Sequence, residues 1–342
     1  MKLGLILLTA VNAVLPIVLI IMFGYFLRRI NFISKDFVKT GNKLVFNILL
    51  PCMLFINVYD IESFDMIQWD IIIYSCIMIC VIFFLGLITA ILLTPVPERR
   101  GVILQCTFRS NFALIGIALA GALGGPQAEA TASIISAATV PLFNILAVIA
   151  LSIFIRGEGN SKYSVKNIVI NIAKNPLILG VLLGMLCLVI RTIQTSVWGE
   201  PVFTIKEDIY FLYKMIDNLK TIASSFALLV LGGQFEFSAV RGLFKEIVVG
   251  TVFRTILAPI IGMGVAIFLS EYTELLNCGV QEYPALVALF GAPVAVSSAV
   301  MAGEMKNDEQ LAAQLVVWSS VCSIATIFLI VCVLMALGYL PL

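Results

Sequence analysis

The sequence contains no histidine among its 342 residues. Histidine is the commonest metal ligand in proteins and the usual general base near neutral pH. Its absence removes Ser-His-Asp triads, Cys-His pairs and the HExxH zinc motif together. We therefore expect no enzyme here, and neither a bound metal nor a cofactor.

Paired cysteines are also missing, because the eight cysteines are scattered and no two form a CxxC motif. Nearly all of them fall inside apolar runs. They are therefore interpreted as small apolar packing residues instead of zinc ligands or a redox pair. The eight positions are Cys52, Cys76, Cys80, Cys106, Cys187, Cys278, Cys322 and Cys332.

Charged residues are also few. Only 12% of the residues are charged, while 61% are hydrophobic, far from the composition of soluble domains. The 21 basic and 20 acidic residues nearly cancel, so no global field indicates a nucleic-acid partner. The sequence therefore predicts an all-α protein whose partner is the lipid bilayer.

The apolar residues form runs long enough to cross a membrane. The first run follows Lys2 and resembles a signal peptide, but it continues to Leu27 and so predicts a spanning helix. Nine further runs bring the expected total to ten transmembrane helices. They cover residues 36–57, 69–93, 101–121, 127–155, 168–190, 210–233, 243–269, 283–303 and 308–340.

Basic residues between these runs predict the orientation. Five loops on one face carry them, whereas the loops 60–70 and 271–282 on the other face are acidic and contain none. By the positive-inside rule, the basic face is cytoplasmic and both termini are extracytoplasmic, in a multi-pass protein of the cell membrane. The loop between Arg191 and Lys214 disagrees, although acidic residues dilute its charge. The basic residues are Arg28, Arg29, Lys35, Arg99, Arg100, Arg156, Lys162, Lys166, Arg241, Lys245 and Lys306.

Two blocks of five spans imply an inverted repeat. A short polar linker, 156–167, separates the first block, 1–155, from the second, 168–342. Because five is odd, the second block enters the membrane from the opposite side. The spacing of eight residues from Pro16 to Gly24 recurs from Pro176 to Gly184, which supports the repeat.

The fourth and ninth spans are both interrupted near their middles. Arg109-Ser110-Asn111 interrupts the fourth, and Gly291-Ala292-Pro293 interrupts the ninth. An unwound point in a membrane helix exposes backbone groups that hydrocarbon cannot satisfy, so it survives only beside a cavity or other protein. Paired broken helices in two inverted halves indicate the binding site of a carrier.

Two arginines at depth indicate the charge of the cargo. Arg109 lies beside the first break and Arg254 lies near the centre of the eighth span, whereas no aspartate or glutamate lies near the centre of any span. Unneutralised positive charge and the positive ends of the half-helices favour a small organic anion, such as a carboxylate. The alternative is that either arginine binds helix-end carbonyls or stabilises the scaffold.

Several segments resemble the auxin efflux carrier family, the PIN-like transporters. Segment 42–51, NKLVFNILLP, resembles that family's second helix, and segment 109–116, RSNFALIG, resembles its fourth-helix crossover. Segments 175–178, 254–259 and 291–293 are similar to its sixth, eighth and ninth helices. The resemblance covers nearly the whole chain, without the long cytoplasmic insert of plant members and without their proline at the fourth-helix crossover.

The resemblance implies a scaffold domain of helices 1, 2, 6 and 7 and a transport domain of helices 3–5 and 8–10. It also implies crossing of helices 4 and 9, an organic anion as substrate, and a homodimer. We therefore expect a secondary transporter that binds its substrate midway through the membrane. The expected binding residues are Asn47, Arg109, Ser110, Asn111, Arg254, Ala292, Pro293 and Val294.

Some alternatives remain open at this point. Asn47, Gln105, Ser297 and Ser298 could equally form hydrogen bonds between helices, and Lys43 could extend to the headgroups. A receptor that keeps a carrier fold without moving its ligand is the main rival function. A passive channel and an enzyme within the bilayer fit the paired breaks less well.

Overall fold

The computed structural model describes residues 2–60, 69–154, 174–236, 238–279 and 282–340. These residues form helices and no strands, apart from one isolated bridge. The predicted linker 156–167, with its basic residues Arg156, Lys162 and Lys166, lies outside the described residues, as does 61–68 in the first acidic loop.

The first half of the chain begins with helix α1 (Lys2–Arg29). The second predicted span consists of α2 (Lys35–Leu44), the π-helical segment η1 (Val45–Leu49) and α3 (Leu50–Tyr59). It is followed by α4 (Trp69–Leu93), α5 (Pro97–Phe108), a second π-helical segment η2 (Phe112–Gly116) and α6 (Ile117–Ser152). Within α6, Gly125 has φ 77° and ψ −170° and separates two helical parts before Pro126.

The second half begins with α8 (Pro176–Trp198), which extends beyond the predicted end at residue 190. The remaining helices are α9 (Ile205–Asp208), α10 (Tyr210–Gln234), α11 (Ala239–Val252), the π-helical η3 (Phe253–Leu257), α12 (Ala258–Tyr272), α13 (Glu282–Gly291), α14 (Ser297–Glu304) and α15 (Glu309–Ala336).

Seven helical segments in the described part of the chain are long and apolar enough to cross a membrane. Large apolar side chains are exposed on their outer faces, as on α8, where Leu182, Leu186 and Ile193 are each more than half exposed. Such surfaces suit lipid, which solvates apolar side chains. The seven segments are Lys35–Tyr59, Trp69–Leu93, Ile117–Ser152, Pro176–Trp198, Tyr210–Gln234, Ala239–Tyr272 and Glu309–Ala336.

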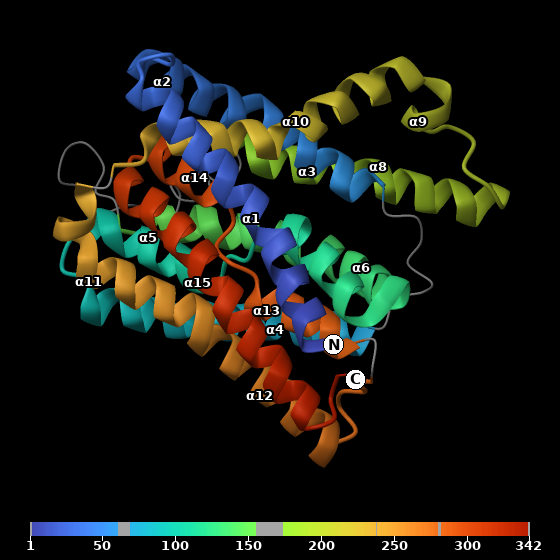
Figure 1. Ribbon diagram of the computed structural model, residues 1–342. Helices are drawn as coiled ribbons and strands as arrows, with labels where there is room; N and C mark the ends of the chain where they lie inside the picture. Colours follow the sequence, from blue (N-terminus) through green and yellow to red (C-terminus); the bar gives the residue numbers. More distant parts are fainter. Residues whose placement is uncertain (1, 61–68, 155–173, 237, 280–281, 341–342) are drawn as a thin grey trace.

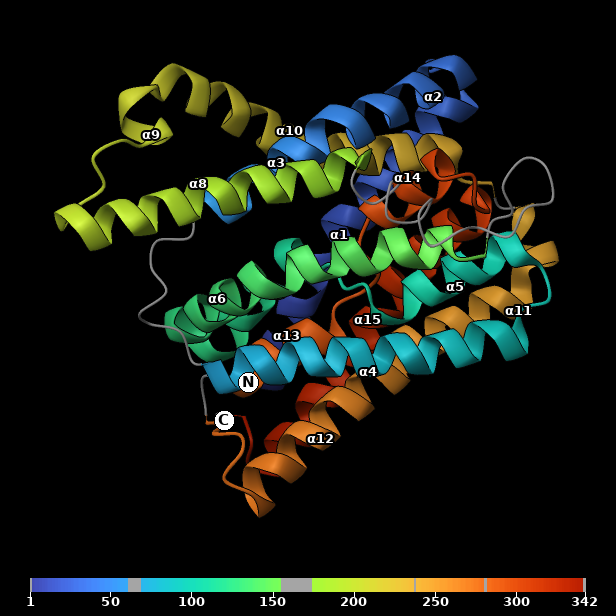
Figure 2. The same cartoon turned by 180° about the vertical axis from the view of Figure 1, so that it is seen from behind.

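The helices form two groups. In both views α2, α3, α8 and α10 lie together along one side of the molecule, while α4, α5, α6 and α11 to α15 make up the other side (Figures 1 and 2). Helix α1 contacts both α10 and α15. The two ends of the described chain lie close together on the same side of the molecule.

Glycines allow close contact within the first group. A Cβ added to Gly24 of α1 would lie 2.1 Å from the carbonyl oxygen of Leu229 in α10. A Cβ added to Gly184 of α8 would lie 2.8 Å from the carbonyl oxygen of Phe55 in α3. Only a residue without a side chain permits backbones to approach this closely, as is common in membrane helix pairs.

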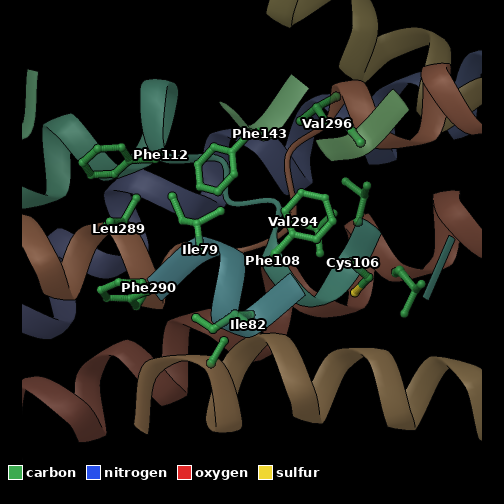
Figure 3. Close-up of a cluster of buried hydrophobic side chains, with 14 of the residues drawn as sticks. Ile79, Ile82, Cys106, Phe108, Phe112, Phe143, Leu289, Phe290, Val294 and Val296 are labelled. Atoms are coloured by element: carbon green, nitrogen blue, oxygen red, sulfur yellow. The ribbon is translucent and has the colours of Figure 1, made fainter. Parts of the chain in front are cut away.

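The second group has an aromatic centre where its helices cross. The ring of Phe108, at the end of α5, lies 5.2 Å from that of Phe83 in α4 and 6.4 Å from that of Phe143 in α6, measured between centroids. Figure 3 shows Phe108, Phe143 and Val294 together. Phe108 is the last residue of α5, so this packing lies directly beside the first break.

Candidate functional site

The two predicted helix breaks meet in space. Ser110 and Val294 form an antiparallel bridge, the N–H of Asn111 donates to the carbonyl of Pro293 (2.8 Å), and the N–H of Ala295 donates to the carbonyl of Arg109 (3.3 Å). The prediction that both spans are unwound and that the breaks lie side by side is therefore confirmed. Some of the backbone groups released at one break are thus satisfied by the other, and a membrane interior requires partners for all of them.

Local sequence explains why the helices stop here. Arg109 at the end of α5 is extended, with φ −80° and ψ 101°, and α13 ends at Gly291 just before Pro293. Proline lacks the N–H that would continue the helix and keeps the preceding residue out of the helical region. The N–H of Val294 donates instead to the hydroxyl of Ser319 in α15 (3.1 Å).

Arg254 holds the two broken ends together. Its guanidinium donates to the carbonyls of Ala292 (2.9 Å), Leu289 (3.1 Å) and Phe290 (2.9 Å) on the α13 side. It also donates to the carbonyls of Thr107 (3.4 Å) and Phe108 (3.2 Å) at the end of α5. A cation suits helix C-termini, where unpaired carbonyls carry partial negative charge. Arg254 is 1% exposed and does not line the crossover cavity described below, so its contacts match the helix-end alternative.

Arg109 has a different environment. One of its terminal nitrogens donates to the amide oxygen of Asn144 (2.7 Å) and to the hydroxyl of Ser297 (2.9 Å), and the other contacts the sulfur of Met301. Arg109 is 3% exposed, and none of these partners is charged. Among the described residues no carboxylate forms an ion pair with it. The guanidinium is therefore a buried, oriented and unneutralised positive charge.

A small cavity of about 50 Å³ lies against this guanidinium. We call it the crossover cavity. One wall is polar and comes from the breaks, with Arg109, Ser110, Asn111, Asn144 and Ser297. The hydroxyl of Ser110 is buried and has no hydrogen-bond partner. The opposite wall is mostly apolar, and Leu50, Met53, Leu54 and Leu177 contribute to it from α3 and α8.

Apart from Arg254 and Asn47, the expected binding residues fall into two sets. Arg109, Ser110 and Asn111 line the crossover cavity. Ala292 and Pro293 supply backbone carbonyls, and Val294 supplies the bridge, without lining the cavity.

Asn47 stands apart, because its side chain is exposed and donates to the carbonyl of Lys43 (2.8 Å). It lies in π-helical η1, and Leu50, the first residue of α3, lines the cavity from this span instead.

Three polar residues of the cavity, Asn144, Ser224 and Ser297, are not among the expected binding residues. Asn144 is 2% exposed, lies in the last third of α6 and accepts a hydrogen bond from Arg109. The sequence does indicate Asn144, because it is an amide within an apolar span, shortly after Pro141. Ser224, on α10, faces the cavity and donates to the sulfur of Met53 (3.6 Å).

The fold is that of a known membrane transporter. The sodium proton antiporter MjNhaP1 from Methanocaldococcus jannaschii matches with a TM-score of 0.58 over 96% of this chain and 97% of the antiporter, at 13% sequence identity. At that identity the likeness concerns the fold. Comparison with curated protein sequences gave no match.

The sequence as a whole matches the profile of one family, described as membrane transport proteins, over residues 9–331. Both this match and the fold are those of secondary membrane transporters, and the resemblance inferred from the segments around both breaks is confirmed. The chain is a multi-pass membrane protein that belongs to the auxin efflux carrier family.

Proposed function

We propose that this protein carries small organic anions bearing a carboxylate, and that the crossover cavity binds them. The observation that supports this most is Arg109, a buried guanidinium whose side-chain partners are all neutral. A charge buried in this way is expensive without a counter-ion, and an anionic substrate would supply one.

The geometry around Arg109 suits a carboxylate in particular. A planar guanidinium binds a carboxylate through two parallel hydrogen bonds. The unpartnered hydroxyl of Ser110 offers a further donor. Helices η2 and α14 begin at the breaks, so their first N–H groups and positive dipole ends lie near the same place.

The opposite wall favours a substrate with one carboxylate and an apolar remainder. Its aliphatic side chains, Leu50, Leu54 and Leu177, would contact that remainder. A second carboxylate would have to lose its water against this wall without gaining a charged partner. We therefore expect indole-acetate to be preferred over malonate and malate.

The crossover cavity in this conformation is too small for such a molecule. A volume of about 50 Å³ holds on the order of three water molecules. Its two walls belong to different groups of helices, α3 and α8 on one side and the crossover on the other. Separation of these groups would enlarge it, as alternating access between a scaffold domain and a transport domain requires.

Matching glycine contacts support an inverted repeat of ten spanning helices. Gly24 of the first span packs on α10 of the seventh, and Gly184 of the sixth span packs on α3 of the second. In the proposed repeat the first span corresponds to the sixth and the second to the seventh. The two glycine contacts are therefore equivalent. Likewise, a Cβ on Gly86 of the third span would meet Thr107 before one break, and a Cβ on Gly262 of the eighth span would meet Phe290 before the other.

Both termini are proposed to be extracytoplasmic in a cell membrane. The ends of the described chain share one side of the molecule (Figure 1), and basic residues such as Arg28, Arg29 and Lys35 lie at the other end of α1. The exposed apolar face of α8 is the surface proposed for a homodimer. Outward movement of an anion would be favoured by about 2.3 kcal/mol per charge per 100 mV of negative-inside potential.

Reconstitution into liposomes tests the proposal. Uptake of labelled indole-acetate, malonate and malate should saturate with wild-type protein. Arg109→Gln and Asn111→Ala should reduce it at least about tenfold, because one charge-assisted contact contributes more than about 1.4 kcal/mol. Arg241→Gln is the matched control, since Arg241 is an exposed cation of α11 outside both described cavities.

Unchanged transport in Arg109→Gln and Asn111→Ala would show that the binding site lies elsewhere. A carboxylate that raises the thermal stability of the protein but never crosses a sealed vesicle would indicate a receptor with a carrier fold.

A further inference from the structure

A second and larger cavity lies at the opposite end of α14 from the crossover cavity. Its volume is about 520 Å³, within the range of small-molecule sites. It lies where the end of α1, α2 and the end of α10 face the end of α14 and the start of α15. We call it the vestibule.

Basic side chains line one wall of the vestibule. Lys35, Lys39 and Lys43 recur every four residues along α2 and so share one face of that helix. Arg28 and Arg29, at the end of α1, extend the same wall. The three lysines are exposed, and no ion pair is found for them among the described residues.

The facing wall is acidic, but the vestibule has fewer acidic than basic side chains. Glu304 and Glu309 are its carboxylates, and Glu236 lines the vestibule just beyond the end of α10, so the lining has five basic and three acidic side chains. Glu309 accepts a hydrogen bond from the amide of Asn42 (3.2 Å). The net charge of the vestibule is therefore positive.

The inner surface of the vestibule has unused hydrogen-bonding capacity. Asn42 is 6% exposed and Gln234 is 9% exposed, and both line the vestibule. The amide oxygen of Asn42 and both polar side-chain atoms of Gln234 have no hydrogen-bond partner. Buried polar groups are normally paired, so these atoms indicate a place that water or a polar ligand occupies.

Two continuous elements connect the vestibule to the crossover cavity. Lys43 lines the vestibule, and seven positions later Leu50, on the same bent helix, lines the crossover cavity. Helix α14 likewise begins with Ser297 at the crossover and ends with Glu304 in the vestibule. Eight helical residues extend about 12 Å.

We propose that the vestibule is an anion-capture site, where the α2 lysines concentrate the carboxylate substrate before it enters the crossover cavity. The inference rests on the proposed function. A cleft lined by one sign of charge between low-dielectric walls raises the local concentration of oppositely charged ligand. The capture site should therefore lower KM without changing the maximal rate, and its effect should disappear at high salt.

The test uses a double variant in liposomes of neutral lipid. Initial rates for labelled indole-acetate, malonate and malate are measured at about 20 mM and at about 500 mM salt, where the screening lengths are about 20 Å and about 4 Å. Lys39→Gln/Lys43→Gln should raise KM about fivefold at low salt with an unchanged maximal rate. At high salt its KM should equal that of wild type.

Two controls make the result specific. Lys39→Arg/Lys43→Arg keeps the charge and should restore the wild-type KM. Lys245→Gln removes an exposed cation of α11 that does not line the vestibule, and it should leave KM unchanged.

The outcomes separate the two proposals. If the wild type carries none of the three carboxylates, the proposed function is overturned and the capture site falls with it. If wild-type flux saturates but the double Gln variant keeps a wild-type KM at low salt, the capture site alone is overturned. A salt-independent rise in KM would also overturn it, because it would indicate a structural effect.

Discussion

Two buried arginines in this protein differ by what they touch. Arg254 donates only to backbone carbonyls at the ends of two half-helices, whereas Arg109 contacts neutral side chains beside a cavity. The first set of contacts fixes the crossover, and the second leaves a positive charge available. The two arginines are buried to a similar degree, so their partners and not their burial distinguish them.

Replacement of Arg254 should weaken the fold. Arg254→Met leaves five carbonyl groups without donors in a buried place, at about 1 kcal/mol or more each. We expect the melting temperature of the protein in detergent to fall by more than 10 °C. The melting temperature of Arg254→Lys should fall less, because lysine keeps the charge. It should still fall, because lysine cannot reach both helix ends. A wild-type melting temperature for Arg254→Met would contradict the structural role.

Asn144→Asp should abolish anion transport without harming the fold. The new carboxylate would occupy nearly the same space, within hydrogen-bond distance of Arg109, and would neutralise its guanidinium. We expect carboxylate flux into liposomes to fall at least tenfold, with a melting temperature equal to that of wild type or higher. Asn47→Asp is the matched control, because Asn47 is exposed and lies outside the cavity. Full activity in Asn144→Asp would refute the role of the Arg109 charge.

The sequence predicts some residues of the site better than others. Arg109, Ser110 and Asn111 were found because a polar triplet interrupts an apolar run. Asn47 is expected in the site as an amide within an apolar span, but its side chain is exposed and lies outside the cavity, and no sequence signal shows that η1 is π-helical. The role of Arg254 needed the positions of carbonyls from two other helices, which no local pattern provides.

At the scale of elements, the breaks are the most predictable feature. Gly291 and Pro293 disfavour a helix, and the polar triplet at 109–111 cannot face lipid. The π-helical segments are different. Both η1 and η3 are followed by a helix with proline at its second position, Pro51 or Pro259, and proline predicts a distortion without specifying its type.

Glycine contacts between helices lead to a prediction about packing. Gly24→Ala and Gly184→Ala should each destabilise the protein by about 1 to 3 kcal/mol, because the added Cβ meets the backbone of the neighbouring helix. Thermal unfolding in detergent measures the effect. Gly264→Ala is the control, since a Cβ there meets nothing within 4 Å. That variant should be as stable as wild type or about 0.5 to 1 kcal/mol more stable. Equal stability of all three variants would show that α1–α10 and α3–α8 are not closely packed.

At the scale of the whole molecule, the fold depends more on the pattern of apolar runs and breaks than on the identity of individual residues. A chain with 13% identity to MjNhaP1 shares its fold with a TM-score of 0.58, since many apolar sequences satisfy the same helix arrangement. The same pattern does not determine the conformational state. Whether a cavity is open or closed depends on how two groups of helices lie against each other, and both states use the same residues.

Hydrogen bonds between those two groups identify where movement should occur. Glu309 of α15 accepts from Asn42 of α2, and Gln310 donates to the carbonyl of Gln234 in α10 (3.2 Å). By contrast, Arg99 of α5 forms an ion pair with Glu246 of α11 (2.9 Å) inside the second group. If alternating access moves the groups apart, only the first set of contacts must break.

Cross-linking distinguishes the two kinds of contact. One variant has cysteines in place of Asn42 and Glu309, which a short bifunctional thiol reagent joins. The reaction should lower its carboxylate flux at least tenfold relative to the same variant before reaction. Cysteines at Arg99 and Glu246 are the matched pair, and their cross-link should leave the flux of that variant within twofold, because both helices move together. If joining α2 to α15 leaves transport intact, the two groups do not separate there, and the carrier must open its closed cavity by movement within a single group.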